Sequence, residues 1–234
     1  MLHLGRTIAP RQLPLSSGAA LMIETIAHGR IEIPAVVTPA AWDGRAGLPM
    51  LMGRSLVVRE LRQSDAGSLL GTLSTEEVSR FIARPPDTVE GFERFIGWTH
   101  QQRAAARAIC FGVVPRGCDA AIGLFQVWPL DSGFTTAEWG FAVGSRFWGT
   151  GVFPDSAHLV LDFVFNVIGA HRVEGRAAQA NGRGNGALHK LGACREAVLR
   201  KCFEIGGEYQ NHIMWSILDE DWRGNRDGAQ AASQ

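Results

Sequence analysis

Apolar residues recur along this chain with two different periods, and together these periods predict a mixed α/β domain. Over Thr135–Val143 the larger apolar side chains occupy every second position, which is typical of a β-strand. Over Pro154–Ile168 they return every three or four residues, which predicts a long amphipathic helix. Gly169 follows this helix at the position where a C-terminal glycine commonly ends one.

The same patterns predict the other elements of the domain. Further strands are expected at Leu56–Leu61, Cys110–Val114, Ala121–Pro129, His171–Ala177, Glu196–Ile205 and Tyr209–Leu218. Helices are expected at Ala66–Leu73 (with Ser64-Asp65 as a cap), Glu76–Ile82, Thr88 to about Arg107, and in a short segment ending at Gly192. This order predicts one α/β (α+β) domain with a mixed, largely antiparallel sheet flanked by helices.

The two ends of the chain differ from this domain. Residues 1–53 contain five of the ten prolines, and their short apolar stretches Leu21–Ile26 and Ile31–Val37 could each form a strand or a helical turn. We expect an extension that packs on the domain or on a partner, with a disordered arm as the alternative. The domain is expected over residues 54–223, and residues 224–234 are expected to be a polar tail.

Composition and charge narrow the class of protein. The 234 residues are 46% hydrophobic and 20% charged, with 23 basic against 23 acidic residues. A zero net charge gives no general affinity for nucleic acid or anionic membranes, and no apolar run is long enough to span a bilayer. The four cysteines show no metal-binding spacing, so we expect no metal and a cytoplasmic protein with reduced thiols, Cys194 and Cys202 among them in the core. A homodimer is left open.

The segment Arg146–Gly151 carries the strongest chemical signal. It has the form R-x-x-G-x-G and joins the strand ending at Val143 to the helix beginning near Val152. Glycines let backbone N–H groups approach an anion, and a helix N-terminus adds unpaired donors. The sequence therefore predicts a phosphate-binding turn at this point.

A second segment also fits this short motif. Gln179–Gly184 has the same form, and Gly182-x-Gly184-x-x-Ala187 is a loose dinucleotide fingerprint. It precedes only a short predicted helix, and too few residues follow it for a doubly wound nucleotide-binding sheet. The first segment is therefore the preferred site.

Several motifs in register extend this interpretation. The runs are Ala137-Glu138-Trp139-Gly140-Phe141, Arg146-x-x-Gly149-x-Gly151, Asp162-Phe163-x-Phe165, His171-Arg172-Val173-Glu174, Asn181, Leu188-x-Lys190-Leu191-Gly192, Glu196-x-x-Leu199-Arg200 and Leu218-x-Glu220-Asp221-Trp222. In order and spacing they resemble the GNAT superfamily of acyl-CoA-dependent N-acetyltransferases, and within it the branch that acetylates the N-termini of ribosomal proteins. The resemblance covers about residues 54–223.

The resemblance implies that acetyl-CoA is the acyl donor and assigns its binding residues. The pyrophosphate would lie on Arg146, Phe147, Trp148, Gly149, Thr150, Gly151 and Val152, and the pantetheine arm would pair with Phe141, Ala142 and Val143, with Asn181 contacting the same arm. Arg183 is added from its charge alone, as a partner for the 3′-phosphate.

Glu138 is the candidate catalytic base. It is the only carboxylate on its strand, and it resembles the glutamate that this branch uses to deprotonate the amine, directly or through water. Partial burial would raise its pKa and make it a better base. Leu188 stands where many members of the superfamily carry an acidic tyrosine, so the acid could be Tyr209, Ser156 or water, or none is needed.

The preferred acceptor is a protein N-terminal α-amine, attacked directly in a ternary complex. The alternatives are a small-molecule amine, such as an aminoglycoside, a polyamine or an amino-acid derivative, and a non-catalytic acyl-CoA-binding module. Structural roles are the alternatives: Glu138 could be an ordinary ion-pair partner and Tyr209 a packing residue, whereas a helix-capping role of Asn181 would be compatible with its contact to the pantetheine arm.

Overall fold

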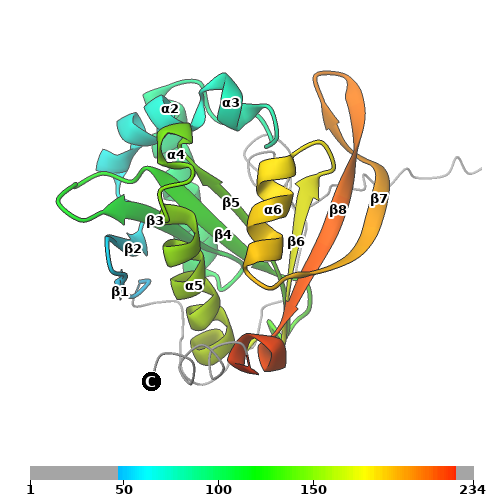
Figure 1. Ribbon diagram of the computed structural model, residues 1–234. Coiled ribbons are helices and arrows are strands. Elements are labelled where there is room, and N and C mark those ends of the chain that lie inside the picture. Colours follow the sequence, from blue (N-terminus) through cyan, green and yellow to red (C-terminus); the bar gives the residue numbers. More distant parts are fainter. Residues whose placement is uncertain (1–46, 225–234) are drawn as a thin grey trace, which may run out of the picture.

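A computed structural model describes residues 47–224, in which eight strands form a single open sheet (Figure 1). The strands are β1 (Leu51–Met52), β2 (Leu56–Glu60), β3 (Ile109–Pro115), β4 (Gly123–Pro129), β5 (Thr136–Val143), β6 (Arg172–Ala178), β7 (Cys194–Ile205) and β8 (Glu208–Leu218). Their order across the sheet is β1-β2-β3-β4-β5-β6-β8-β7. The predictions for Leu21–Ile26 and Ile31–Val37, and nearly all of the predicted tail, lie outside the described residues.

Helices separate the strands at the predicted places. They are α2 (Ala66–Leu73), α3 (Glu76–Ser79), α4 (Val89–Ala104), α5 (Val152–Phe163) and α6 (Gly182–Lys190), with short 3-10 turns at Gln63–Asp65 and Ser145–Phe147. α5 continues as a π-helical turn over Val164–Ile168, and Gly169 ends it in the left-handed conformation, as predicted. The side chain of Thr88 caps α4 by accepting a hydrogen bond from the Gly91 amide.

One pair of neighbouring strands runs parallel, and all the other pairs are antiparallel. The parallel pair is β5 with β6, in register from Thr136 opposite Arg172 to Trp139 opposite Gly175. The predicted mixed, largely antiparallel sheet is therefore confirmed. The structure adds the edge strand β1, which belongs to the predicted extension and pairs with β2.

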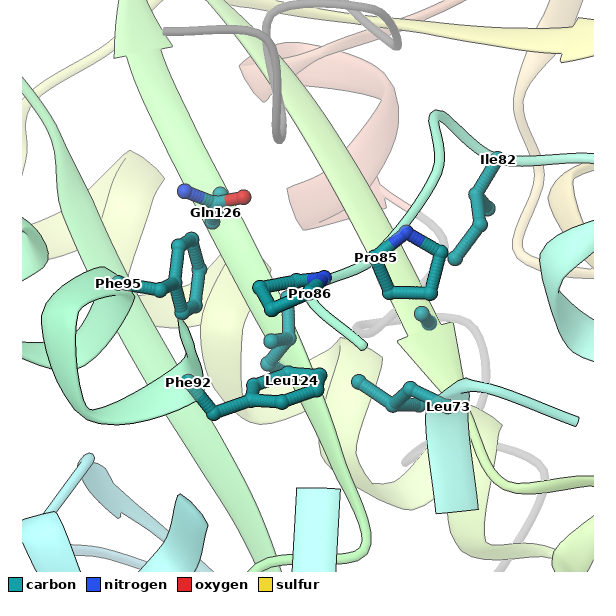
Figure 2. Close-up of a pocket in the computed structure, with 9 residues that line it drawn as sticks. Leu73, Ile82, Pro85, Pro86, Phe92, Phe95, Leu124 and Gln126 are labelled. Atoms are coloured by element: carbon teal, nitrogen blue, oxygen red, sulfur yellow. The ribbon is translucent and has the colours of Figure 1, made fainter. Parts of the chain in front are cut away.

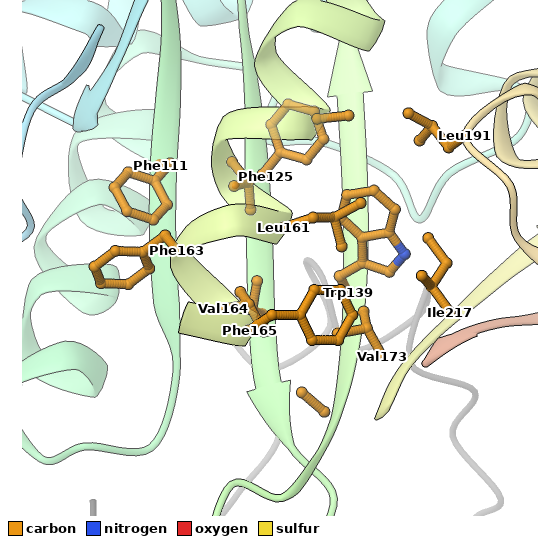
Figure 3. Packing of buried hydrophobic residues seen from close by; sticks show 14 of the residues in the cluster. Phe111, Phe125, Trp139, Leu161, Phe163, Val164, Phe165, Val173, Leu191 and Ile217 are labelled. Carbon is orange, nitrogen blue, oxygen red and sulfur yellow. The ribbon is translucent and has the colours of Figure 1, made fainter. Parts of the chain in front are cut away.

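The two faces of the sheet carry separate apolar cores because side chains alternate along each strand. On one face α2 and α4 cover the central strands, where Leu73, Phe92 and Phe95 pack near Leu124 of β4 (Figure 2). On the other face α5 covers Phe111, Phe125, Trp139 and Val173 (Figure 3). Trp139 and Glu138 consequently face opposite sides of β5, as the alternation predicted.

Two cysteines expected in the core are not buried there. Cys194 is exposed and Cys202 is half-buried, because both belong to β7 at the open edge of the sheet. Cys110 is buried, as apolar patterning in a central strand requires, and burial raises the pKa of its thiol. Within the described part of the chain, no helix is long and apolar enough to cross a bilayer.

A buried ion pair joins the start of the domain to its central hairpin. The two terminal guanidinium nitrogens of Arg59 donate to the carboxylate of Asp65, at 2.8 and 2.9 Å. The same carboxylate accepts the amides of Arg62 and Ala121, and Arg59 also donates to the Asp119 carbonyl. Burial acts to raise the pKa of Asp65, but these hydrogen bonds prevail and lower it. Asp65 therefore links three segments, where the sequence predicted only a helix cap.

Replacing Asp65 with alanine should destabilise the fold strongly. The substitution leaves the Arg59 guanidinium buried without its counter-charge, which typically costs about 3–5 kcal/mol of unfolding free energy. Denaturant unfolding measures this change. The matched control is Asp87→Ala, which removes the partner of the exposed Arg84 and should leave the unfolding midpoint unchanged. Equal effects of the two substitutions would show that the buried pair does not stabilise the domain.

Candidate active site

The turn between β5 and α5 has the geometry of an anion site. After the 3-10 turn Ser145–Phe147, Gly149 and Gly151 both adopt positive φ, at 77° and 87°. These left-handed conformations favour glycine, and nothing lies within 4 Å of the place where either would carry a Cβ. The backbone of the turn is therefore open to an approaching group.

The amides of Phe147, Trp148 and Thr150 bond carbonyl groups within this turn, but other backbone donors of the turn have no such partner among the described residues. Within residues 47–224, no backbone acceptor bonds the N–H groups of Gly149, Gly151, Val152 or Phe153. The helix direction adds positive potential at the same point, because these residues form the N-terminus of α5. Such unpaired amides are the usual protein donors to a phosphate.

Side chains of the turn support it without blocking it. The Thr150 hydroxyl donates to the Phe147 carbonyl at 2.7 Å, and the Trp148 indole donates to the Val143 carbonyl at 2.8 Å. Arg183 reaches across from α6, with its guanidinium carbon 4.7 Å from the centre of the Trp148 ring. The structure thus brings Arg183, chosen from sequence on charge alone, to the glycine turn, where Arg146 is also exposed.

β5 presents an open edge beside this turn. It pairs with β6 only as far as Trp139, whereas it pairs with β4 through Val143. Beyond Gly175, β6 continues alongside β8 and leaves Phe141–Val143 without a strand neighbour on that side. This wedge between two strands could admit an extended chain with amide groups, such as a pantetheine arm.

Asn181 has the helix-capping role that was expected to be compatible with a contact to the pantetheine arm. Its side-chain oxygen accepts the Gly184 amide at 2.8 Å and caps α6. The side-chain nitrogen of Asn185 bonds the Ala178 carbonyl at 2.9 Å, so the end of β6 is held by α6. A cap of this kind fixes the start of α6, and with it Arg183, beside the wedge.

Glu138 is buried next to the point where the wedge closes. Its side chain lies on the sheet face covered by α2 and α4, and the residue is 5% exposed. Arg176 of β6 approaches it, with 3.3 Å between Nη1 and Oε2, and Glu174 lies directly opposite Glu138 in the parallel register. Among residues 47–224, Arg176 is the one ion-pair partner of this carboxylate, which lacks a full set of hydrogen bonds there.

Burial raises the pKa of Glu138 to about 7, and this effect outweighs the attraction of Arg176, which lowers the pKa. The charge of Glu174 raises it further. Glu174 is itself bonded by Arg172, whose second partner is Glu196. A carboxyl group with a pKa near 7 can accept a proton at neutral pH and release it again, which is what a general base must do.

Neither candidate acid lies near Glu138. Tyr209 is 63% exposed near the turn of the β7–β8 hairpin, and the strand from Ser216, level with Glu138, to Tyr209 spans roughly 23 Å. The Ser156 hydroxyl is buried and donates to the Val152 carbonyl within α5 at 2.7 Å. The geometry thus favours water, or no acid at all, over both side chains.

Sequence reasoning missed the polar neighbours of Glu138. Arg176 and Glu174 could have been found from the alternation of polar residues along β6, once β6 was paired in parallel with β5. Gln126 and His212 could not, because their burial depends on distant segments. Burial lowers the pKa of His212 to about 4, and the charge of Arg176 lowers it further.

In the described ranges, no group of three or more His, Cys, Asp or Glu side chains could hold a metal ion.

Comparisons with known proteins agree with this geometry. A family model described as an acetyltransferase (GNAT) domain matches residues 55–193. The probable N-acetyltransferase YjcK of Bacillus subtilis is 29% identical over 180 residues, covering 74% of this chain and 98% of that protein.

Solved structures share the fold. The ribosomal-protein-S5-alanine acetyltransferase of Vibrio fischeri superposes with a TM-score of 0.67 at 20% identity, covering 74% of this chain and 98% of that one. Mycobacterium smegmatis RimJ in complex with CoA-disulfide gives a TM-score of 0.66 at 18% identity, covering 74% and 87%. The chain therefore belongs to the GNAT family, whose members are acetyl-CoA-dependent N-acetyltransferases.

Proposed function

We propose that this protein transfers the acetyl group of acetyl-CoA to a protein N-terminal α-amine. The amine nitrogen attacks the thioester carbonyl directly, Glu138 takes the proton that the amine loses, and the carbon–sulfur bond then breaks to release CoA. The observation that carries the proposal is a buried carboxyl group with a pKa of about 7 beside the open edge of β5.

The unpaired amides at the start of α5 support the binding of CoA by this turn. They would bond the pyrophosphate, with Arg146 at the turn and Arg183 within reach for the 3′-phosphate. The free edge over Phe141–Val143 would pair with the pantetheine amides. The RimJ structure with CoA-disulfide supports the same ligand class for this fold.

The choice of an α-amine follows from proton affinities. At pH 7 an α-amine is neutral in about one molecule in ten, whereas a lysine amine is neutral in roughly one in a few thousand. A base with a pKa near 7 can take the proton of an α-amine, whose pKa is close to its own. It deprotonates a lysine amine less readily, because the pKa of lysine is much higher. The named activity of the Vibrio fischeri neighbour on a ribosomal protein supports the same acceptor class.

Replacing Gly151 with alanine should weaken acetyl-CoA binding by roughly tenfold. A Cβ at this position of positive φ strains the turn and stands where the phosphate would approach the amides. Isothermal titration with CoA measures the dissociation constant. Gly117→Ala is the matched control, because Gly117 also has a positive φ with open space around it but lies in the β3–β4 turn. If both variants bind CoA as the parent does, the turn is not the phosphate site.

Replacing Glu138 with glutamine should lower kcat by roughly tenfold or more and remove one limb of the pH profile. The parent loses activity as the pH falls through about 7, because Glu138 becomes protonated and can no longer accept a proton. The limb set by the acceptor amine remains in the variant. Thiol release with N-terminal peptides, measured from pH 5.5 to 9, records both limbs.

Two controls identify the limb that belongs to Glu138. Peptides whose α-amines differ in pKa should move only the acceptor limb. Below about pH 4.5, where the carboxyl group is protonated in the folded and in the unfolded chain, the variant should melt at the temperature of the parent, since glutamine resembles the protonated carboxyl group. A parent-like pH profile in the folded variant would exclude Glu138 as the base.

A further inference from the structure

A small apolar cavity lies on the same sheet face as Glu138, within the core that α2 and α4 cover. It sits between β4, α2, α4 and the segment that joins α3 to α4 (Figure 2). Its lining residues are Leu73, Ile82, Pro85, Pro86, Phe92, Phe95, Leu124, Gln126 and Ala142. It has room for about one water molecule, and no charged side chain lines it.

Gln126 is the one polar side chain of this lining, and it is unsatisfied. The residue is 1% exposed, and neither its amide oxygen nor its amide nitrogen has a hydrogen-bond partner within the described ranges. Leaving a buried amide unbonded is unfavourable, and most buried polar groups are therefore hydrogen-bonded. The amide is therefore poised to accept one hydrogen bond and donate another to something that enters the cavity.

The strand register connects Gln126 to the proposed base. Gln126 lies opposite Gly140, and Trp128 lies opposite Glu138, so Gln126 and Glu138 are diagonal neighbours on one face. The Cβ atoms of such neighbours are roughly 7–8 Å apart, within reach of long side chains. Gly140 carries no side chain, so nothing from β5 fills the space between them.

We propose that Gln126 determines which acceptor amines are used, by hydrogen-bonding a neutral polar group carried on the carbon next to that of the amine. The inference rests on the proposed function, in which the amine lies at Glu138. A hydroxyl group fits best: it has about the size of the space available, and it both donates and accepts, as the free amide does. The preferred acceptors would therefore all contain a 2-amino alcohol unit, as in an N-terminal serine or a free amino alcohol.

The apolar lining also disfavours acceptors that carry a charged group or a methyl group next to the amine. A charged group next to the amine would be buried among leucine, proline and phenylalanine side chains without a counter-charge. A methyl group would fit but would leave the amide of Gln126 unbonded. We therefore expect hydroxyl-bearing acceptors to be preferred over methyl-bearing ones, and both over acidic or basic ones.

The test compares acceptors that differ by one hydroxyl group. Two peptides that begin with Ser or Ala and are otherwise identical form one arm, and ethanolamine with ethylamine forms the other. The parent should have a higher kcat/KM for the hydroxyl-bearing member. In Gln126→Met, which keeps the length of the side chain, the hydroxyl-to-methyl ratio should fall roughly fivefold to tenfold, the value of one neutral hydrogen bond. Leu124→Met, which alters the same cavity without touching an amide, should keep the ratio.

Each outcome separates this inference from the proposed function. A ratio that falls with the peptides supports both, and a ratio that falls with ethanolamine while neither peptide is acetylated supports Gln126 but contradicts the protein acceptor. Acetylation of both peptides at an unchanged ratio in Gln126→Met overturns the role of Gln126 alone; a lower melting temperature would then show that its amide holds a structural water. No acetylation of any of the four acceptors overturns both.

Discussion

The candidate site depends on the separation of β5 from β6 beyond Trp139 and Gly175. Up to that level the parallel strands exchange backbone hydrogen bonds, and beyond it β6 stays with β8 while β5 stays with β4. The separation leaves Phe141–Val143 without a strand neighbour on one side in the interior of a sheet, where both sides of a strand would normally be paired, and the Trp148 indole bonds the Val143 carbonyl there. Gly175 leaves room for the Trp139 side chain just before the strands part, because a Cβ there would come within 2.8 Å of the Trp139 indole nitrogen.

The open edge left by this separation and the neighbouring N-terminus of α5 are both suited to binding the same ligand. The open strand edge can pair with an extended amide-containing arm, and the N-terminus of α5 directs unpaired amides at the place where such an arm would end in phosphates. Glu138 lies at the closed end of the wedge. Burial raises its pKa to about 7, so the carboxyl group is partly protonated at pH 7. Arg176 limits that effect, so the group titrates near neutral pH rather than staying protonated throughout the physiological range.

Local patterns in the sequence predicted most of the fold. The alternation over β5 and the helical stripe of α5 are strong, and Gly169 ends that helix as expected, since these features depend on residues close in the chain. The glycine turn was predicted for the same reason. The partner of Glu138, the buried amide of Gln126 and the exposure of Cys194 were not, because each depends on strand order and register across segments far apart in sequence. Asp65 shows the same limit: its neighbours suggested a cap, and its carboxylate bonds Arg59 instead.

The central claim is that the free amides of Gly149, Gly151, Val152 and Phe153, together with the open edge of β5, bind CoA. Amide hydrogen exchange with and without CoA tests it most directly, because a bound phosphate and pantetheine arm would slow exchange of those donors. The account predicts protection concentrated in peptides covering 140–153, with little change in the β2–β3 region. Saturating CoA that leaves 140–153 exchanging as before, while protecting another part of the chain, would contradict it.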